Sequence, residues 1–330
     1  MKKMLTILSL LCLSLTALTP LTPLTADAAA PATGIPKNLV IASGPLGGPW
    51  YTACTKMSEV AMREIPGINI TVIEGSAEGN LMLANRGTDV QLAMTSSMLA
   101  YPALTGKNEA KKNTPNLKGV MAVLTSWSQT GTPESSSIKS FSDLIGKRFS
   151  SGKRGYISDI LFHRIAKEYG VSNEKIAAAG GKIHQVAWGE YPQLLGDGHL
   201  DAFCINGEVP HNIVMQIETT IPVRILSVDK EIQEKILKEE PFLVGRTFPA
   251  GVYKGTKEPV NLIGYAGILV ANDKLSDEFL TKFVAAMQNN KDEILKEVPF
   301  MDLLGWDLAM SGIGEETMRP AVLKQIKEKQ

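Results

Sequence analysis

One stretch decides the fold of this chain, NLVIASGPLGGPWY at residues 38–51. Its first five residues are typical of a buried strand, and the glycines and prolines that follow predict a loop leading into a helix. The helix carries apolar residues on one face and stops at Pro66-Gly67. The stretch therefore predicts a strand, a loop and a helix in succession, which is the repeating unit of a parallel α/β sheet.

The same rhythm continues along the chain in two regions. Further strands are predicted at 69–73, 90–94 and 120–124, then at 183–188, 200–205, 223–228 and 265–270, with helices at 81–86, 156–169 and 277–295. Between the regions, residues 125–137 are rich in Ser, Thr and Gly, as expected for a crossing between domains. The sequence near Phe248 leads back toward a strand of the first region. Two crossings between two α/β lobes predict a hinge.

The N-terminus has the pattern of a secretory signal peptide. A basic head at Lys2-Lys3 precedes an apolar core from Leu5 to Leu18, which is shorter than the roughly 20 residues that span a bilayer. An Ala-x-Ala pattern follows, and we expect cleavage after Ala28. Cys12 lies inside the apolar core after Leu11, where a lipoprotein would have a small residue. The rest of the chain is predicted to be exported through the inner membrane to the periplasm. No later stretch of it is expected to span a membrane.

Composition narrows the classes of partner. The chain has 34 basic and 34 acidic residues, so it has no general attraction for nucleic acid or anionic lipid. About 300 residues remain after the predicted leader, enough for two domains. Cys54 and Cys204 are predicted to lie on opposite lobes as packing residues, because a disulfide between them would lock the cleft.

The loops that follow strands are the candidate ligand site, because ligands of open α/β sheets bind beyond the carboxyl ends of the strands. The loops at 43–51 and 150–156 offer backbone N–H groups at helix starts, and the second adds two adjacent cations suited to a carboxylate or phosphate. Loops at 74–80 and 95–97 add hydroxyl and amide groups. The predicted ligand-binding residues are Gly47, Gly48, Trp50, Tyr51, Ser76, Asn80, Ser96, Lys153, Arg154, Tyr156, Trp188 and Asn206.

Each of these residue types also has a structural interpretation. A glycine-rich turn is an ordinary connector, Ser76 or Asn80 can cap a helix, and Lys153-Arg154 can form a solvated basic turn. Trp188 taken alone is better explained by packing than by a ligand contact, although aromatic walls are typical of small-molecule sites. The glycine loop does not fit G-x-G-x-x-G, and the loop at 150–156 lacks the glycine and hydroxyl of a phosphate-binding P-loop.

Motifs of catalysis and metal binding are missing from the sequence. It contains no G-x-S-x-G, C-x-x-C or H-E-x-x-H pattern, and the four histidines lack metal-ligand spacing among themselves. We therefore expect no catalytic residue, no metal and no cofactor, and a protein that is not an enzyme.

Five segments together resemble the TAXI family of TRAP-transporter solute receptors. They lie at 44–51, 75–81, 143–147, 198–202 and 248–253, and the resemblance covers nearly all of the chain after the leader. It implies an α/β, two-lobed periplasmic-binding-protein fold of type II, with a hinged cleft between two parallel-rich sheets. The lobes are expected at 36–124 with 247–330 (lobe I) and at 125–246 (lobe II), after a signal peptide at 1–28.

The resemblance also implies a function, the capture of a small organic acid or amino acid for delivery to TRAP membrane permease subunits. The chain departs from the family at Thr95-Ser96-Ser97, where Gln-Ser-Asp is frequent, and at Lys153-Arg154, where a Gly/Ser-rich run is usual. The two cations predict an acidic ligand, either a dicarboxylate or an acidic amino acid. The alternatives are an exported enzyme and a ligand-sensing domain on the same two-lobed scaffold.

Overall fold

The opening strand, loop and helix are present in the structure, a computed structural model that describes residues 34–107, 114–154 and 156–330. Strand β1 (Asn38–Ala42) leads through a loop into helix α1 (Pro49–Glu64). Gly47 in this loop has a φ of +75°, a conformation that favours glycine, and Pro49 occupies the first turn, where a helix needs no N–H from it. The predicted signal peptide at 1–28 lies outside the described residues.

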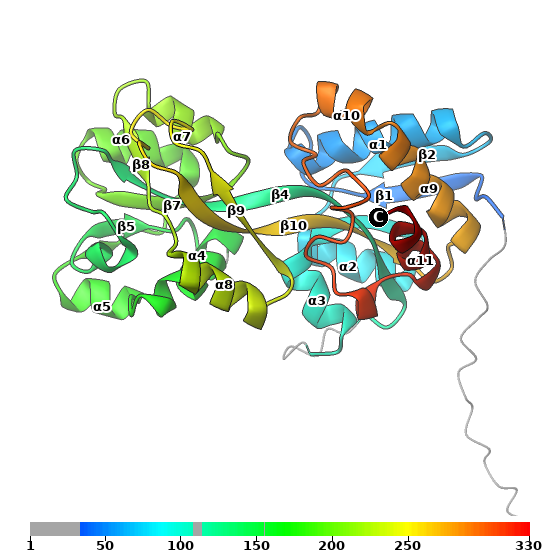
Figure 1. The fold of residues 1–330 in the computed structure, drawn as a ribbon, viewed down its shortest axis with the longest axis horizontal. Helices are drawn as coiled ribbons and strands as arrows, with labels where there is room; N and C mark the ends of the chain where they lie inside the picture. Colours follow the sequence, from blue (N-terminus) through cyan, green and yellow to red (C-terminus); the bar gives the residue numbers. More distant parts are fainter. Residues whose placement is uncertain (1–33, 108–113, 155) are drawn as a thin grey trace, which may run out of the picture. The chain divides into compact units, whose positions relative to one another are not determined.

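Lobe I is built from the first part of the chain and its end (Figure 1). Strands β1, β2 (Asn69–Ile73) and β3 (Leu92–Ser96) pair in parallel, with β1 in the middle. The helices of this part are α1, α2 (Ala77–Arg86), α3 (Ser97–Leu104), α9 (Asp277–Asn289), α10 (Lys291–Glu297) and α11 (Pro320–Lys329), and a 3-10 turn, η3, lies at Glu315–Thr317. The single helix predicted at 277–295 is interrupted at Asn290, where α9 ends and α10 begins.

Lobe II repeats the parallel pattern with shorter strands. Strand β5 (Arg148–Ser150) pairs in parallel with both β6 (Lys182–Ile183) and β7 (Ala202–Gly207). The helices are α4 (Ile157–Glu168), α5 (Asn173–Ala178), α6 (Tyr191–Gly196), α7 (Asn212–Ile217) and α8 (Lys230–Glu239), with 3-10 turns η1 (Phe141–Leu144) and η2 (Trp188–Glu190). The predicted strand at 183–188 is wrong beyond Ile183, because its end forms the turn that begins at Trp188.

Two long antiparallel strands, β4 (Leu117–Pro133) and β10 (Val260–Asn272), run through both lobes. Figure 1 shows them side by side between the blue and green parts of the chain. Strand β4 pairs with β7 and β8 (Val223–Ile225) in lobe II, and β10 pairs with β3 in lobe I and with β9 (Leu243–Phe248). The crossing predicted at 125–137 is made by a continuous strand as far as Pro133.

The hydrophobic core divides at matching positions of these two strands. Lobe I has one cluster that includes Leu124 of β4 and Ala266 of β10, and lobe II has two clusters that include Trp127 and Tyr265. Phe248, Tyr253, Val260 and Leu262 pack in a cluster of lobe II, and β10 continues from there toward lobe I. Because the two crossing strands are paired with each other, one edge of lobe I faces one edge of lobe II.

Candidate functional site

A cavity of about 870 Å³ lies where the two lobes face each other. Its wall contains loops and helix starts of both lobes and the crossing segment of β4. The lining segments are 44–45, 48–50, 75–77, 124–126, 156–158, 188–189, 206–208 and 211–213, joined by Tyr265 and Phe300. Most of these segments follow the carboxyl end of a strand, which is where ligands of open α/β sheets bind.

Four helices begin at this cavity, the longer α1, α2 and α4 and the six-residue α7. The first residues of the three longer helices, at 49–50, 77 and 157–158, belong to its wall. The first N–H groups of a helix have no partner within the helix, and the start of the helix dipole is positive. Ser76 satisfies one of these groups, because its hydroxyl accepts a hydrogen bond from the Gly79 N–H at 3.3 Å. The remaining donors make the cavity suited to an anionic group.

Several polar side chains in the wall have no hydrogen-bond partner among the described residues. They are both amide atoms of Asn206, the hydroxyl of Thr125 and the indole N–H of Trp188. Asn206 is only 4% exposed, and Thr125 is 5% exposed. Buried polar groups normally have partners, so such a concentration beside a cavity indicates partners on a ligand.

Aromatic side chains form much of the remaining wall. Trp188 makes edge-to-face contacts with Tyr156 and with His211, at centroid distances of 5.7 and 6.0 Å. Burial raises the pKa of the Tyr265 phenol, and the adjacent Ser126 and Asn206 side chains oppose this shift. The Asn206 amide lies near that phenol without forming a hydrogen bond of normal geometry. Apolar walls with a few polar anchors are typical of small-molecule sites.

One carboxylate and one imidazole are the titratable acid and base groups of the wall. Glu208 follows β7, and His211 precedes α7. The Nδ1 atom of His211 accepts a hydrogen bond from the Ile213 N–H at 3.2 Å, so a neutral ring carries its proton on Nε2. Burial lowers the pKa of His211, and the nearby Glu208 carboxylate partly opposes this effect. The ring is therefore neutral at pH 7.

Half of the residues predicted for ligand binding line the cavity. They are Gly48, Trp50, Ser76, Tyr156, Trp188 and Asn206. Gly47 and Tyr51 adjoin the wall without being part of it. The Asn80 amide instead donates to the Ser43 and Met94 carbonyls, both at 2.7 Å, and thereby fixes the lobe I loops. The Ser96 hydroxyl caps α3 by accepting from the Met98 N–H at 3.2 Å.

Lys153 and Arg154 are exposed and do not belong to the cavity wall. Their loop turns at Gly152, whose φ is +97°, and the side chains extend from the surface beside the start of α4. The described wall contains no lysine or arginine at all. An anion in this cavity would therefore meet backbone donors, uncharged side chains and the Glu208 carboxylate, but no lysine or arginine of the described wall.

The wall also contains residues that the sequence reasoning did not select as contacts. Thr125 and Tyr265 lie on the crossing strands, and His211 opens a helix of only six residues. Glu208 was not chosen, although the nearby Asn206 was. The sequence signal that could have identified Glu208 is its position two residues after Asn206, at the end of the same strand.

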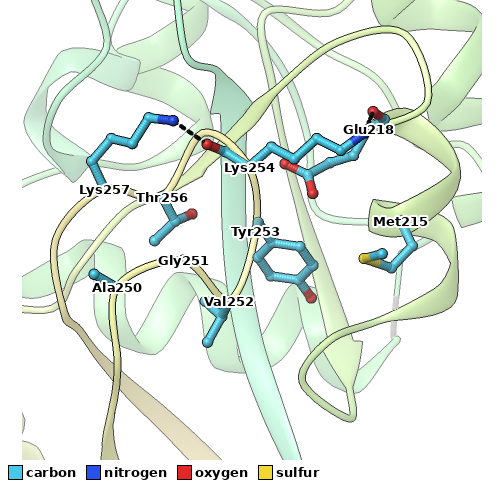
Figure 2. Close-up of a pocket in the computed structure, with 9 residues that line it drawn as sticks. All are labelled: Met215, Glu218, Ala250, Gly251, Val252, Tyr253, Lys254, Thr256 and Lys257. Carbon is cyan, nitrogen blue, oxygen red and sulfur yellow. Dashed lines mark hydrogen bonds between the residues drawn. The ribbon is translucent and has the colours of Figure 1, made fainter.

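A second pocket of about 450 Å³ lies in lobe II and is lined by residues 250–254 with their neighbours (Figure 2). The Lys254 ammonium donates to the Glu218 carbonyl at 3.0 Å, and the Glu218 carboxylate accepts from the Val223 N–H at 3.0 Å. The charged groups near this pocket thus stabilise the loop that lines it. Tyr253 at its base contacts the cavity wall, because its hydroxyl accepts a hydrogen bond from the His211 N–H at 2.6 Å.

The two described cysteines are free and fully buried, as predicted for packing residues. Burial raises the pKa of Cys54 to about 12 and that of Cys204 to about 11, so neither is a reactive thiolate at neutral pH.

Among residues 34–107, 114–154 and 156–330, no group of three or more acidic, His or Cys side chains could hold a metal ion. Over the same residues, no helix is long and apolar enough to cross a membrane.

Comparison with known proteins gives a family and a fold. The model of the NMT1-like family matches residues 41–304. The periplasmic aliphatic sulphonate binding protein SsuA from Escherichia coli superimposes with a TM-score of 0.51 at 14% identity, covering 89% of this chain and 79% of that one. A putative sulfonate-binding SsuA from Methylobacillus flagellatus KT reaches 0.49 at 16% identity over 88% and 84% of the chains. PhnD1 from Prochlorococcus marinus, solved with methylphosphonate, reaches 0.48 at 16% identity over 81% and 90%. The superposition on the Escherichia coli protein confirms the two-lobed periplasmic-binding-protein fold.

Proposed function

This chain belongs to the NMT1-like family, and from that premise we propose that it is a solute-binding receptor of a membrane transporter. In this proposal the protein is exported to the periplasm, binds a small solute between its lobes and presents it to the membrane subunits. It performs no chemistry on the solute. The predicted signal peptide supports export, and the fold supports capture between lobes.

One observation carries the proposal, the cavity between the lobes with its converging helix starts and unpartnered polar groups. Asn206, Thr125 and Trp188 offer hydrogen bonds that no described residue uses. Receptors with micromolar affinity need about 8 kcal/mol of net binding free energy. Hydrogen bonds to a charged ligand group contribute about 1.5–3 kcal/mol each, so several donors acting together are sufficient.

The proposed ligand is a small organic anion, either a dicarboxylate or an acidic amino acid. The starts of α1, α2 and α4 are the groups that would bind its carboxylate, since no lysine or arginine belongs to the described wall. The two aromatic side chains Trp188 and Tyr156 would cover its carbon atoms. Closure of the lobes would exclude water and strengthen these contacts.

The proposed partner is a TRAP membrane permease of the TAXI type. The support is the order and spacing of the five sequence segments that resemble TAXI receptors, from residue 44 to residue 253. To test this, the permease is reconstituted in vesicles and the exported protein is added to them. We expect ligand uptake that requires the receptor and an ion gradient, whereas uptake driven by ATP hydrolysis would contradict the TRAP assignment.

Ligand binding itself is tested by isothermal titration of the protein purified from the periplasm with organic acids and amino acids. We expect at least one carboxylate to bind at micromolar concentration and to be recovered unchanged. Conversion of the bound compound would indicate an exported enzyme. Binding without any effect on vesicle uptake would indicate a sensing domain. Affinity only for solutes without an anionic group would contradict the proposed ligand class.

A further inference from the structure

We propose that Glu208 binds the ammonium group of the ligand, so that the captured solute is an amino acid rather than a dicarboxylate. This inference rests on the proposed receptor function and identifies the substrate class of its cavity. It makes Glu208 the residue that determines charge specificity.

Glu208 is the one carboxylate in the described cavity wall, and no lysine or arginine accompanies it there. Its side chain is partly buried and forms no ion pair or hydrogen bond with any residue that the structure describes. A carboxylate that loses water when two lobes close needs a cationic or donating partner. Because the described wall offers no cation, the ligand is the group that can supply one.

The position of Glu208 is fixed by buried hydrogen bonds behind it. The Gln129 side chain donates from Nε2 to the Glu208 carbonyl at 2.9 Å, and its Oε1 accepts from the Tyr253 hydroxyl. That hydroxyl in turn accepts from the His211 N–H. Gln129 and Tyr253 are 0% and 1% exposed, so the segment from Glu208 to His211 has a rigid support. Such support is what a binding side chain requires for a defined geometry.

The groups beside Glu208 also suit an ammonium ion. Asn206 has a free carbonyl oxygen at the end of the same strand, and an ammonium group has three donors to satisfy. The His211 ring is neutral, so it does not neutralise the carboxylate. Trp188 packs edge-to-face against that ring and adds an aromatic surface, which attracts cations at its face.

The two ends of an amino acid therefore correspond to different walls of the cavity. Its carboxylate matches the starts of α1 and α2 in lobe I, which are positive, and its ammonium group matches the Glu208 segment in lobe II. A dicarboxylate would bring a second negative charge toward Glu208 in a space of low dielectric constant, where like charges repel strongly. The cavity thus distinguishes an amino acid from the acid that lacks its amino group.

Titration calorimetry with pairs of ligands tests this inference. The probes are L-glutamate with glutarate and L-leucine with 4-methylpentanoate, and each pair differs by one ammonium group. We expect the amino acid of the binding pair to be at least about tenfold tighter, as one charge-assisted hydrogen bond implies. Equal or tighter binding of the deaminated acid by the unaltered protein would overturn the role of Glu208. That comparison needs no variant.

The variant Glu208→Gln tests the residue directly. It keeps the shape of the side chain, so we expect a 10- to 100-fold loss of amino-acid affinity with no loss for the deaminated acid. Glu231→Gln is the matched control, because it removes the same charge from an exposed position of α8 in the same lobe. An equal loss for both members of a pair, or no loss for either, would refute the inference. If neither pair binds and no other carboxylate does, the proposed function itself fails.

Discussion

The two lobes present different chemistry to the cavity between them. Lobe I contributes the glycine-containing β1–α1 and β2–α2 loops with two helix starts, together with Trp50 and Ser76. Lobe II contributes the start of α4 and the side chains of Glu208, His211, Asn206, Trp188 and Tyr156. Backbone donors recognise any carboxylate, whereas side chains distinguish one carboxylate from another. We infer that lobe I supplies general affinity and that lobe II supplies specificity.

The glycines of lobe I allow the backbone of the cavity wall to lie close to neighbouring groups. A Cβ atom placed on Gly75 would lie 1.9 Å from the Asn80 Oδ1 atom and 3.0 Å from the Ser43 carbonyl oxygen. Asn80 is fully buried and holds two loops together. No side chain can therefore be added at this position without moving the groups that shape the cavity.

The largest effect is expected for Gly75→Ala. Displacing Asn80 breaks two buried hydrogen bonds, each worth about 1–3 kcal/mol, and shifts the start of α2. We expect at least about a 100-fold loss of affinity for every ligand and a lower melting temperature, measured by titration calorimetry and thermal unfolding. Gly196→Ala is the control, because a Cβ there meets nothing within 4 Å. Selective loss of one ligand would contradict a general role for lobe I.

The second effect compares buried asparagines in the two lobes. Asn206 has no partner among the described residues, so Asn206→Leu should lower affinity about 10- to 100-fold while thermal stability stays equal or rises. Asn272 in lobe I, 1% exposed, donates to the Ala84 carbonyl at 2.7 Å. Asn272→Leu should therefore lower stability by about 1–3 kcal/mol and leave affinity nearly unchanged. A destabilised Asn206→Leu protein would show that Asn206 is structural.

A third, smaller effect is a dependence of stability on pH that comes from lobe II. The pKa of His211 is lowered in the folded protein by burial, so the unfolded chain binds a proton first as the pH falls below about 6.5. The His211 contribution to stability is complete above that pH and is lost as the pH falls toward the folded pKa. His211→Asn keeps a capping side chain for α7 and should flatten this part of the profile. Thermal unfolding between pH 5 and 8 would show an unchanged slope if another group were responsible.

The smallest effect is expected for Lys153→Gln and Arg154→Gln. Both side chains are exposed outside the cavity wall, and exposed charges are largely screened at physiological salt. We expect less than about a twofold change in affinity for any carboxylate, measured by titration calorimetry. A tenfold loss would mean that closure brings one of these cations to the ligand, as the sequence alone had suggested.

Much of the fold could be predicted from local sequence, but the strand conformation of the crossing segment could not. The predicted strands at 38–42 and 69–73 coincide with β1 and β2, because short runs with apolar residues bounded by turns are a strong signal. The second half of β4 is rich in Ser, Thr and Gln, and this composition predicted a crossing between domains but not a strand. Its polar groups are buried through distant partners, such as the Thr132 hydroxyl, which donates to the Asp201 carbonyl at 2.9 Å. Hydropathy does not detect such contacts.

The site was predictable to the level of loops but not of individual contacts. The rule that ligands bind at the carboxyl ends of strands indicated the segments that form the wall. Within them, sequence does not reveal which side chains face the cavity. The charge of Lys153 and Arg154 was visible while their exposure was not, and Asn80 was indistinguishable from a ligand contact until its bonds to Ser43 and Met94 were seen.

Capture of the solute between the lobes is the central claim, and small-angle X-ray scattering tests it most directly. The protein is measured alone and with a saturating concentration of whichever probe, L-glutamate or L-leucine, binds more tightly. Closure of lobes joined through β4 and β10 predicts a smaller radius of gyration in the presence of ligand and no change with a non-binding probe. An identical radius of gyration at saturation would contradict capture by closure.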